Sequence, residues 1–259
     1  MSFSVHVDVR NPGQFFACCG LFELASRMSE GAVAHFETER FIVEAACSLD
    51  ELLDGLTGSP LVAVDNEDIT ASPIDFPEVF RLRLDWWKDA GGGGRELKVW
   101  AGSMQSMRIA QAMVTALRGP AFHSENLLDA GCVVYDPDAT TTKVEPYYFD
   151  ARRALNAHSR DVGFSPNDLS LTTTAFPAVE ALCLVGLQRC RPAPQRDEQR
   201  RIFRYSVWQE PLPVTLLAAV VSGAVPTRGS RTFEFENWFR TGKRQLKAYR
   251  YSVPSTKGE

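Results

Sequence analysis

The sequence predicts an α+β fold in which helices pack on a mixed, mainly antiparallel sheet. Apolar residues alternate over residues 3–9, 79–87 and 202–208, as they do in half-buried strands. Helical signals lie between these stretches without the regular strand–helix–strand order of a parallel sheet. The 259 residues fit one large domain or two subdomains, residues 1–120 and a basic region of residues 121–259.

Local signals place elements along the first half. Asn11 is a good N-cap and Pro12 a good first helical residue, so a buried helix is expected directly after the first strand. Residues 33–46 are strand-like, and Ser48 with Glu51 predicts a capping box on a short helix. Residues 57–78 are expected to be loop, and Ser103 is expected to cap a helix at residues 104–117.

The clearest strand of the sequence is predicted at residues 79–87. The four glycines at residues 91–94 are expected to join it to residues 97–100 as a hairpin with a flexible tip. In the second half, short strands are expected at residues 133–135 and 144–149 around a polar turn, followed by an irregular segment. The remaining predictions are helices at 177–189 and 213–222, strands at 202–208 and 231–239, and a basic segment at 240–250.

Composition is typical of a soluble globular protein, with 44% hydrophobic and 23% charged residues. The longest apolar run, residues 214–221, is far shorter than the roughly 20 residues that span a bilayer. The start of the chain lacks the pattern of a secretory signal peptide. We therefore expect a cytoplasmic protein with no membrane partner.

The cysteines and histidines predict neither a metal site nor a cofactor. The six cysteines include no Cys-x-x-Cys pair, and the four histidines have no metal-ligand spacing. Cys18 and Cys19 could be read as nucleophiles, but they lie two turns into an apolar helix with no histidine nearby to act as a base. Close-packed core is the favoured interpretation, and no enzyme motif is visible.

Charge is distributed unevenly along the chain. Residues 1–150 carry 11 Lys and Arg against 23 Asp and Glu, whereas residues 151–259 carry 17 against 9. This asymmetry favours a polyanion or an acidic partner for the second half. Acidic and basic faces that neutralise each other within one domain would explain it equally well.

Three groups of residues are candidates for nucleic-acid contacts, because cations bind phosphates and aromatic rings stack on bases. Lys88, Arg95 and Lys98 lie on the predicted hairpin, with Trp86, Trp87 or Trp100 available for stacking. A second group is Arg152, Arg153, Asn156 and Arg160 on the irregular segment, and a third is Lys243, Arg244, Lys247 and Arg250 near Tyr249 and Tyr251. For each group the alternative is a solvated surface or a mobile loop.

Two blocks of sequence carry a resemblance. Residues 11–25, Asn-Pro-Gly-Gln-Phe-Phe-Ala-Cys-Cys-Gly-Leu-Phe-Glu-Leu-Ala, are similar to the N-terminal signature of a family of type I-G (formerly I-U) CRISPR-associated proteins. The second block comprises Tyr-Phe-Asp-Ala-Arg-Arg from residue 148, Asp-Val-Gly-Phe-Ser-Pro from 161, Thr-Ala-Phe-Pro-Ala-Val-Glu from 174 and Leu-Gln-Arg-Cys-Arg-Pro from 187. That family is classed as a reduced large subunit of the crRNA-guided Cascade complex.

The resemblance implies a non-catalytic subunit in antiviral defence that binds nucleic acid. It implies other Cascade subunits, crRNA, target DNA and the helicase-nuclease as partners, with a contribution to PAM recognition. Asn11 and Gln14, at the expected exposed start of the first helix, join the arginines as candidate contacts because they lie in the matching blocks. The alternatives are a scaffold that binds only other subunits and a small-molecule enzyme that uses Cys18 or Cys19.

Overall fold

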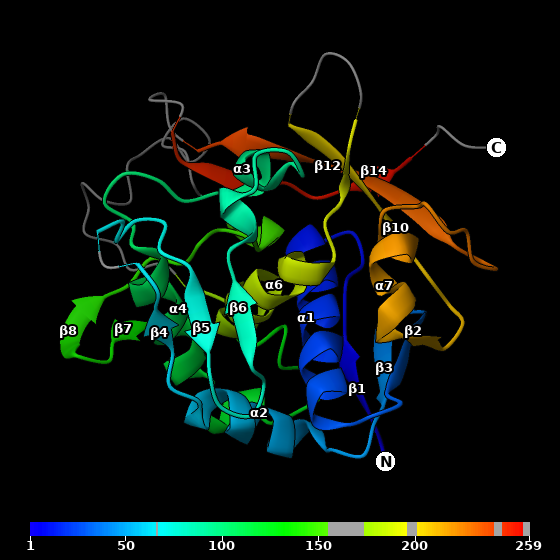
Figure 1. The fold of residues 1–259 in the computed structure, drawn as a ribbon, viewed down its shortest axis with the longest axis horizontal. Helices are drawn as coiled ribbons and strands as arrows, with labels where there is room; N and C mark the ends of the chain where they lie inside the picture. Colours follow the sequence, from blue (N-terminus) through cyan, green and yellow to red (C-terminus); the bar gives the residue numbers. More distant parts are fainter. Residues whose placement is uncertain (66, 155–173, 196–200, 241–244, 256–259) are drawn as a thin grey trace.

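The computed structural model describes residues 1–259 except 66, 155–173, 196–200, 241–244 and 256–259. It confirms the α+β class, with helices packed against antiparallel sheets (Figure 1). Two helices lie side by side at the centre, α1 (Pro12–Met28) and α6 (Pro177–Arg189). Both are buried on every side over most of their length, as their continuous apolar sequences predict.

A four-stranded antiparallel sheet lies on one side of α1. Its order is β1 (Ser2–His6), β3 (Arg40–Glu44), β2 (Val33–Glu37) and β11 (Leu212–Pro213). The strand-like segment at residues 33–46 is therefore the β2–β3 hairpin. The first strand is shorter than predicted and ends at residue 6, because the chain then turns into the N-cap of α1.

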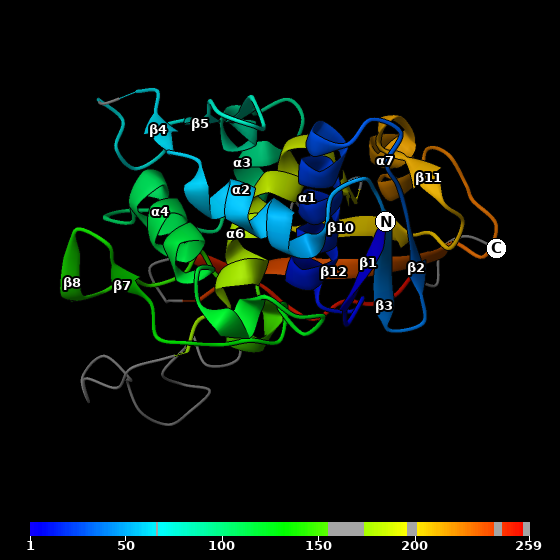
Figure 2. The same cartoon turned by 90° about the horizontal axis from the view of Figure 1, so that it is seen from below.

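A five-stranded sheet covers another side of the central helices (Figure 2). Its long strands are β10 (Ile202–Val207) and β12 (Arg231–Phe239), which confirm the predictions there. The shorter strands are β9 (Ala193–Pro194), β13 (Lys247–Tyr249) and β14 (Val253–Pro254). Aromatic rings from its inner face stack on the start of α1. The ring centroids of Tyr205 in β10 and Phe15 in α1, for example, lie 4.3 Å apart.

Smaller elements complete the layers. The capping box predicted at Ser48 begins α2 (Leu49–Gly58), and an apolar helix α7 (Val214–Val221) follows β11. Helix α4 (Ser106–Ala116) begins later than predicted: its N-cap is Gln105, and the Ser106 hydroxyl donates to the Ser72 carbonyl. Ser103 therefore does not cap this helix.

The strand and hairpin predicted at residues 79–100 are wrong. Only β6 (Leu82–Leu84) forms, paired with β5 (Ile74–Phe76), which in turn pairs with β4 (Val62–Ala63). Positive φ angles of 54° at Val79 and 47° at Arg81 interrupt the extended backbone before it.

After β6 the chain forms a 3-10 turn, η1 (Trp86–Lys88), and the glycine run leads into the short helix α3 (Gly94–Leu97). A Cβ at Gly94 would lie 2.8 Å from the Trp86 carbonyl carbon, so a residue without a side chain is needed there. The glycines thus make a compact turn within the fold rather than a hairpin tip.

The short strands predicted around residues 133–149 are also displaced. The observed hairpin is β7 (Tyr135–Asp136) and β8 (Ala139–Lys143), so the threonine run is strand and not turn. Residues 144–149 form no strand, and Tyr148 has a φ of 79°. Two further 3-10 turns are η2 (Pro120–Phe122) and η3 (Ala151–Arg153).

Most of the buried apolar residues of the described chain form one cluster that runs from Val5 to Tyr249. No helix in the described ranges is long and apolar enough to cross a membrane.

Candidate nucleic-acid interface

The two blocks of the family resemblance meet at the start of α1. Asn11 caps the helix, since its Oδ1 accepts from the Gly13 amide at 3.1 Å. The same oxygen accepts from the Ala151 amide at 3.0 Å, and its Nδ2 donates to Asp150 Oδ1 at 3.0 Å. One fully buried side chain therefore joins the helix cap to the segment that precedes η3.

Glu180 of α6 binds the same segment from the other side. Its carboxylate accepts the backbone amides of Tyr148, Phe149 and Asp150 at 3.0, 3.2 and 3.1 Å. Burial raises the pKa of Glu180 to about 7, although these amide donors favour its ionised form. Asn11 and Glu180 together satisfy backbone groups that would otherwise be buried without partners.

The prediction that Asn11 and Gln14 are exposed is wrong. Asn11 is 0% and Gln14 is 2% exposed. Gln14 accepts from the Asp8 amide at 2.7 Å and donates to the Leu128 carbonyl at 3.3 Å and Asp129 Oδ1 at 3.1 Å. Both polar side chains are used to fix backbone, so neither is available to a ligand.

The arginines of the second block are also held by the protein. Arg152 forms ion pairs with Asp150 at 2.7 Å and Asp129 at 2.9 Å, and its guanidinium lies 3.5 Å from the centre of the Phe176 ring. Arg153 is only 5% exposed. Asn156 and Arg160 lie outside the described residues. The structure therefore gives Arg152 and Arg153 structural contacts and not an open binding surface.

Cys18 and Cys19 are core residues, as the favoured interpretation predicted. Both are 0% exposed, and burial raises the pKa of each thiol well above its usual value. Across the residues that the structure describes, no group of three or more His, Cys, Asp and Glu is placed to hold a metal ion.

The fold brings together two basic groups that are far apart in the sequence. Lys247 Nζ donates to the Glu96 carbonyl at 2.6 Å, and the Lys247 amide donates to the Val99 carbonyl at 2.9 Å. Asn237 Nδ2 also donates to the Glu96 carbonyl, at 2.7 Å. These bonds fix α3 against the ends of β12 and β13 (Figure 1), and they bring Lys98 and Arg201 close enough to Lys247 for their charges to add to the effect of burial, which lowers its pKa.

We call this region the α3–β13 surface. Its members on the α3 side are Lys88, Arg95, Lys98 and Lys247, and those on the opposite face of β12 and β13 are Trp238 and Arg250, with Arg201 near both Lys247 and Trp238.

Exposure differs among the cations of the α3–β13 surface. Lys88, Arg95 and Arg250 are exposed, and Lys88 Nζ lies 3.5 Å from Asp65 Oδ2. Lys98 and Lys247 are half-buried. Burial lowers the pKa of Lys98 and brings that of Lys247 to about 8. Lys243 and Arg244 lie outside the described residues.

Of the aromatic residues predicted to lie beside the basic groups, Tyr251 is 42% exposed and the others are buried. Trp86, Trp87 and Trp100 are at most 2% exposed, and Tyr249 is fully buried. The indole N–H groups of the three tryptophans donate to the carbonyls of Leu184, Ala71 and Thr70. These rings belong to the core because each finds both apolar contact and a hydrogen-bond partner there.

Trp238 is the aromatic residue that the sequence argument missed. It is 38% exposed on β12, whereas the other four tryptophans are buried. The guanidinium carbon of Arg201 lies 4.8 Å from the centre of its ring and that of Arg250 lies 5.2 Å away. Alternation along the predicted strand at 231–239 already puts this residue on the face opposite the buried Phe233 and Phe235.

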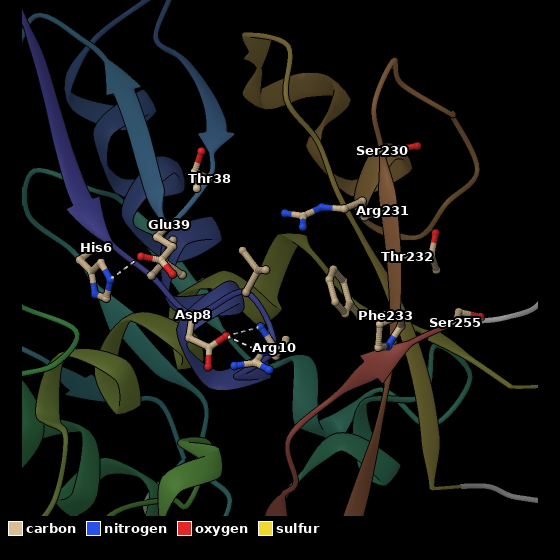
Figure 3. A pocket seen from close by; sticks show the side chains of 13 residues that line it. His6, Asp8, Arg10, Thr38, Glu39, Ser230, Arg231, Thr232, Phe233 and Ser255 are labelled. Atoms are coloured by element: carbon tan, nitrogen blue, oxygen red, sulfur yellow. Dashed lines mark hydrogen bonds and ion pairs between the residues drawn. The ribbon is translucent and has the colours of Figure 1, made fainter.

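A groove lies elsewhere, between the start of the chain and β12 (Figure 3). Its volume is about 910 Å³, and Arg231 reaches toward it from one wall. On the other wall, His6 faces Glu39 at 3.8 Å and Asp8 pairs with Arg10 at 3.3 Å. Among the candidate contact residues that the structure describes, none lines this groove.

Comparison with protein-family models, with curated proteins and with solved structures finds no match to this chain.

Proposed function

We propose that this chain is a non-catalytic subunit of a type I CRISPR surveillance complex, of the reduced large-subunit kind found in type I-G systems. In this proposal it works in the cytoplasm with other Cascade subunits, crRNA and target DNA. It contacts nucleic acid, contributes to PAM or target recognition and helps recruit the helicase-nuclease, while guide pairing reads the sequence.

The observation that carries the nucleic-acid part is the convergence of cations on the α3–β13 surface. Residues 88–98 and 247–250 are separated by about 150 positions in the chain, yet direct hydrogen bonds join the two segments. Clustered Lys and Arg side chains neutralise backbone phosphates and release counterions. On the opposite face of β12, the exposed Trp238 adds a π-face beside Arg201 and Arg250.

The buried junction supports the family resemblance. The resemblance rests on separate short blocks, and three of their residues meet: Asn11 binds Asp150, and Glu180 binds the amide of Asp150. The blocks therefore contribute to one buried core in this chain, and we propose that the binding surface lies elsewhere on the fold.

The assembly part is tested by co-expressing the chain with the neighbouring operon products. We expect it to co-purify with a crRNA-loaded complex. If the chain runs alone while that complex forms intact, the subunit proposal is wrong. Co-purification without any nucleic-acid contact would instead support the scaffold alternative.

The nucleic-acid part is tested with charge reversal. Lys88→Glu, Arg95→Glu and Arg250→Glu in one variant should weaken binding of short DNA or crRNA and reduce its salt dependence. Arg40→Glu, Arg83→Glu and Arg118→Glu form the matched control, because they reverse the same number of charges at exposed arginines on other parts of the fold. Equal losses in the two variants would show that the α3–β13 surface has no special role.

A further inference from the structure

We propose that Trp238, flanked by Arg201 and Arg250, is a stacking site for an unpaired base of single-stranded nucleic acid. This inference deepens the nucleic-acid contact proposed above and rests on it. Three features of the α3–β13 surface lead to it: an exposed indole, cations beside that indole and the way both are held by the sheet.

The exposure of Trp238 is unusual within this chain. Trp86, Trp87, Trp100 and Trp208 are all at most 2% exposed, whereas Trp238 is 38% exposed. A tryptophan side chain offers a large apolar face, and leaving it in water forfeits the hydrophobic stabilisation that burial gives. The ring is therefore the strongest candidate among the tryptophans for contact with a flat partner.

The cations beside the ring are positioned by the sheet. The Arg250 amide donates to the Glu236 carbonyl at 3.0 Å, and its guanidinium lies 3.4 Å from Glu236 Oε2. The Arg201 guanidinium lies 4.6 Å from the centre of the Phe239 ring as well as 4.8 Å from that of Trp238. Both arginines are therefore held near the indole before any ligand arrives, which lowers the cost of ordering them on binding.

The combination of an aromatic face with guanidinium groups selects the ligand chemistry. Bases stack on exposed aromatic rings, and cations beside the ring bind the adjacent phosphates. In a duplex each base is already stacked between neighbours, so an indole on a sheet surface reaches only an unpaired base. Lys247 adds positive charge near Arg201, and this favours a polyanion over a protein partner.

Intrinsic fluorescence and two oligomers test the site in the full-length chain. Oligothymidine should quench the emission of the protein, because Trp238 is the tryptophan accessible to it. Trp238→Ala should weaken oligothymidine binding about 5-fold to 100-fold, and Trp238→Phe should weaken it less. An abasic oligomer of the same length keeps the phosphates but offers no base, so its affinity should be the same for the parent chain and for Trp238→Ala.

Tyr135→Ala is the matched control, because Tyr135 is 44% exposed but lies on the β7–β8 hairpin. Circular dichroism checks that each variant is folded. Unchanged oligothymidine binding in Trp238→Ala, or equal losses for both oligomers, would overturn the stacking site. Loss of co-purification with other subunits while oligothymidine binding is unchanged would also overturn it, by assigning Trp238 to a protein interface.

These results separate the two proposals. If the chain joins the crRNA complex and binds oligomers through its cations while Trp238→Ala has no effect, only the stacking inference fails. If the chain joins no such complex but Trp238→Ala selectively weakens oligothymidine binding, the stacking site stands and the assignment to the surveillance complex fails.

Discussion

Gly20 of α1 and Gly186 of α6 face each other where the two central helices cross. A Cβ built on Gly20 would lie 2.9 Å from the Gly186 amide nitrogen, and one built on Gly186 would lie 2.8 Å from the Gly20 amide nitrogen. The obstacle at each position is backbone, which cannot move aside as a flexible side chain can. This close crossing lets α1 and α6 pack directly against each other.

Substitution of either glycine by alanine should therefore separate the helices. We expect Gly20→Ala and Gly186→Ala each to lower the free energy of unfolding by about 3 kcal/mol or more, at or above the usual cost of overpacking a core. Gly58→Ala is the control, because Gly58 also lies in a helix but has open space around it. That variant should be neutral or stabilised by up to about 1 kcal/mol. Urea unfolding of the three variants measures the difference, and equal stability would contradict the close crossing.

The residue at position 11 needs an amide side chain, because it donates a hydrogen bond in addition to capping the helix. Aspartate usually caps a helix as well as asparagine does. Here, however, Asn11→Asp would replace the amide that donates to Asp150 with a second buried carboxylate. We expect it to cost about 3 kcal/mol or more. Combining it with Asp150→Asn restores a donor–acceptor pair and should recover part of the loss. A double-mutant cycle with no coupling would contradict the contact.

Signals that act over a few residues predicted the fold well. Asn11 with Pro12, the Ser48–Glu51 capping box and Pro177 marked the starts of three helices correctly. The alternation of apolar residues at residues 79–87 predicted a strand that does not form over this length. The same pattern also fits a turn in which both tryptophan indoles of this segment are buried. Trp86 leaves the strand direction to donate to the Leu184 carbonyl of α6, a contact that no local pattern encodes.

For the candidate site too, the sequence predicted local features correctly but not the contacts between distant segments. The sequence identified Lys98 and Lys247 as cations, but their proximity depends on bonds between α3 and β13 that span about 150 residues. Conversely, Asn11 and Gln14 looked like surface polar groups because composition does not show which buried backbone groups need partners. The exposure of Trp238 could have been predicted, since alternation along the strand at residues 231–239 places its side chain on the face opposite the buried Phe235.

Thiol reactivity should follow burial in the folded chain. All six cysteines are free, and Cys132 is the partly exposed one. We expect a disulfide reagent to label Cys132 slowly in the native protein and the other five only after unfolding. Cys132→Ser should remove the native-state labelling. Rapid labelling of Cys18 or Cys19 would contradict their placement in the core and revive the nucleophile interpretation.

Glu180 should make the stability of the protein depend on pH between about 4.5 and 7. Burial raises its pKa from 4.5 to about 7 in the folded chain; nearby Asp150 acts in the same direction, whereas the Arg153 guanidinium and the amide donors oppose it. In this window the folded state holds a proton that the unfolded state has released. The free energy of unfolding should therefore fall as pH rises, by a total on the order of 3 kcal/mol from this group, and level off above pH 7.

Glu180→Gln removes this titration and keeps a carbonyl oxygen as an acceptor for the Tyr148–Asp150 amides. We expect urea unfolding at pH 5 and pH 7.5 to show a smaller difference in this variant than in the parent chain. Glu145→Gln is the control, since the Glu145 side chain is 56% exposed. It should keep the parent's pH dependence. If Glu180→Gln and Glu145→Gln respond to pH alike, the buried carboxyl does not carry the proton, and the junction between α1 and α6 is held by an ionised Glu180 throughout.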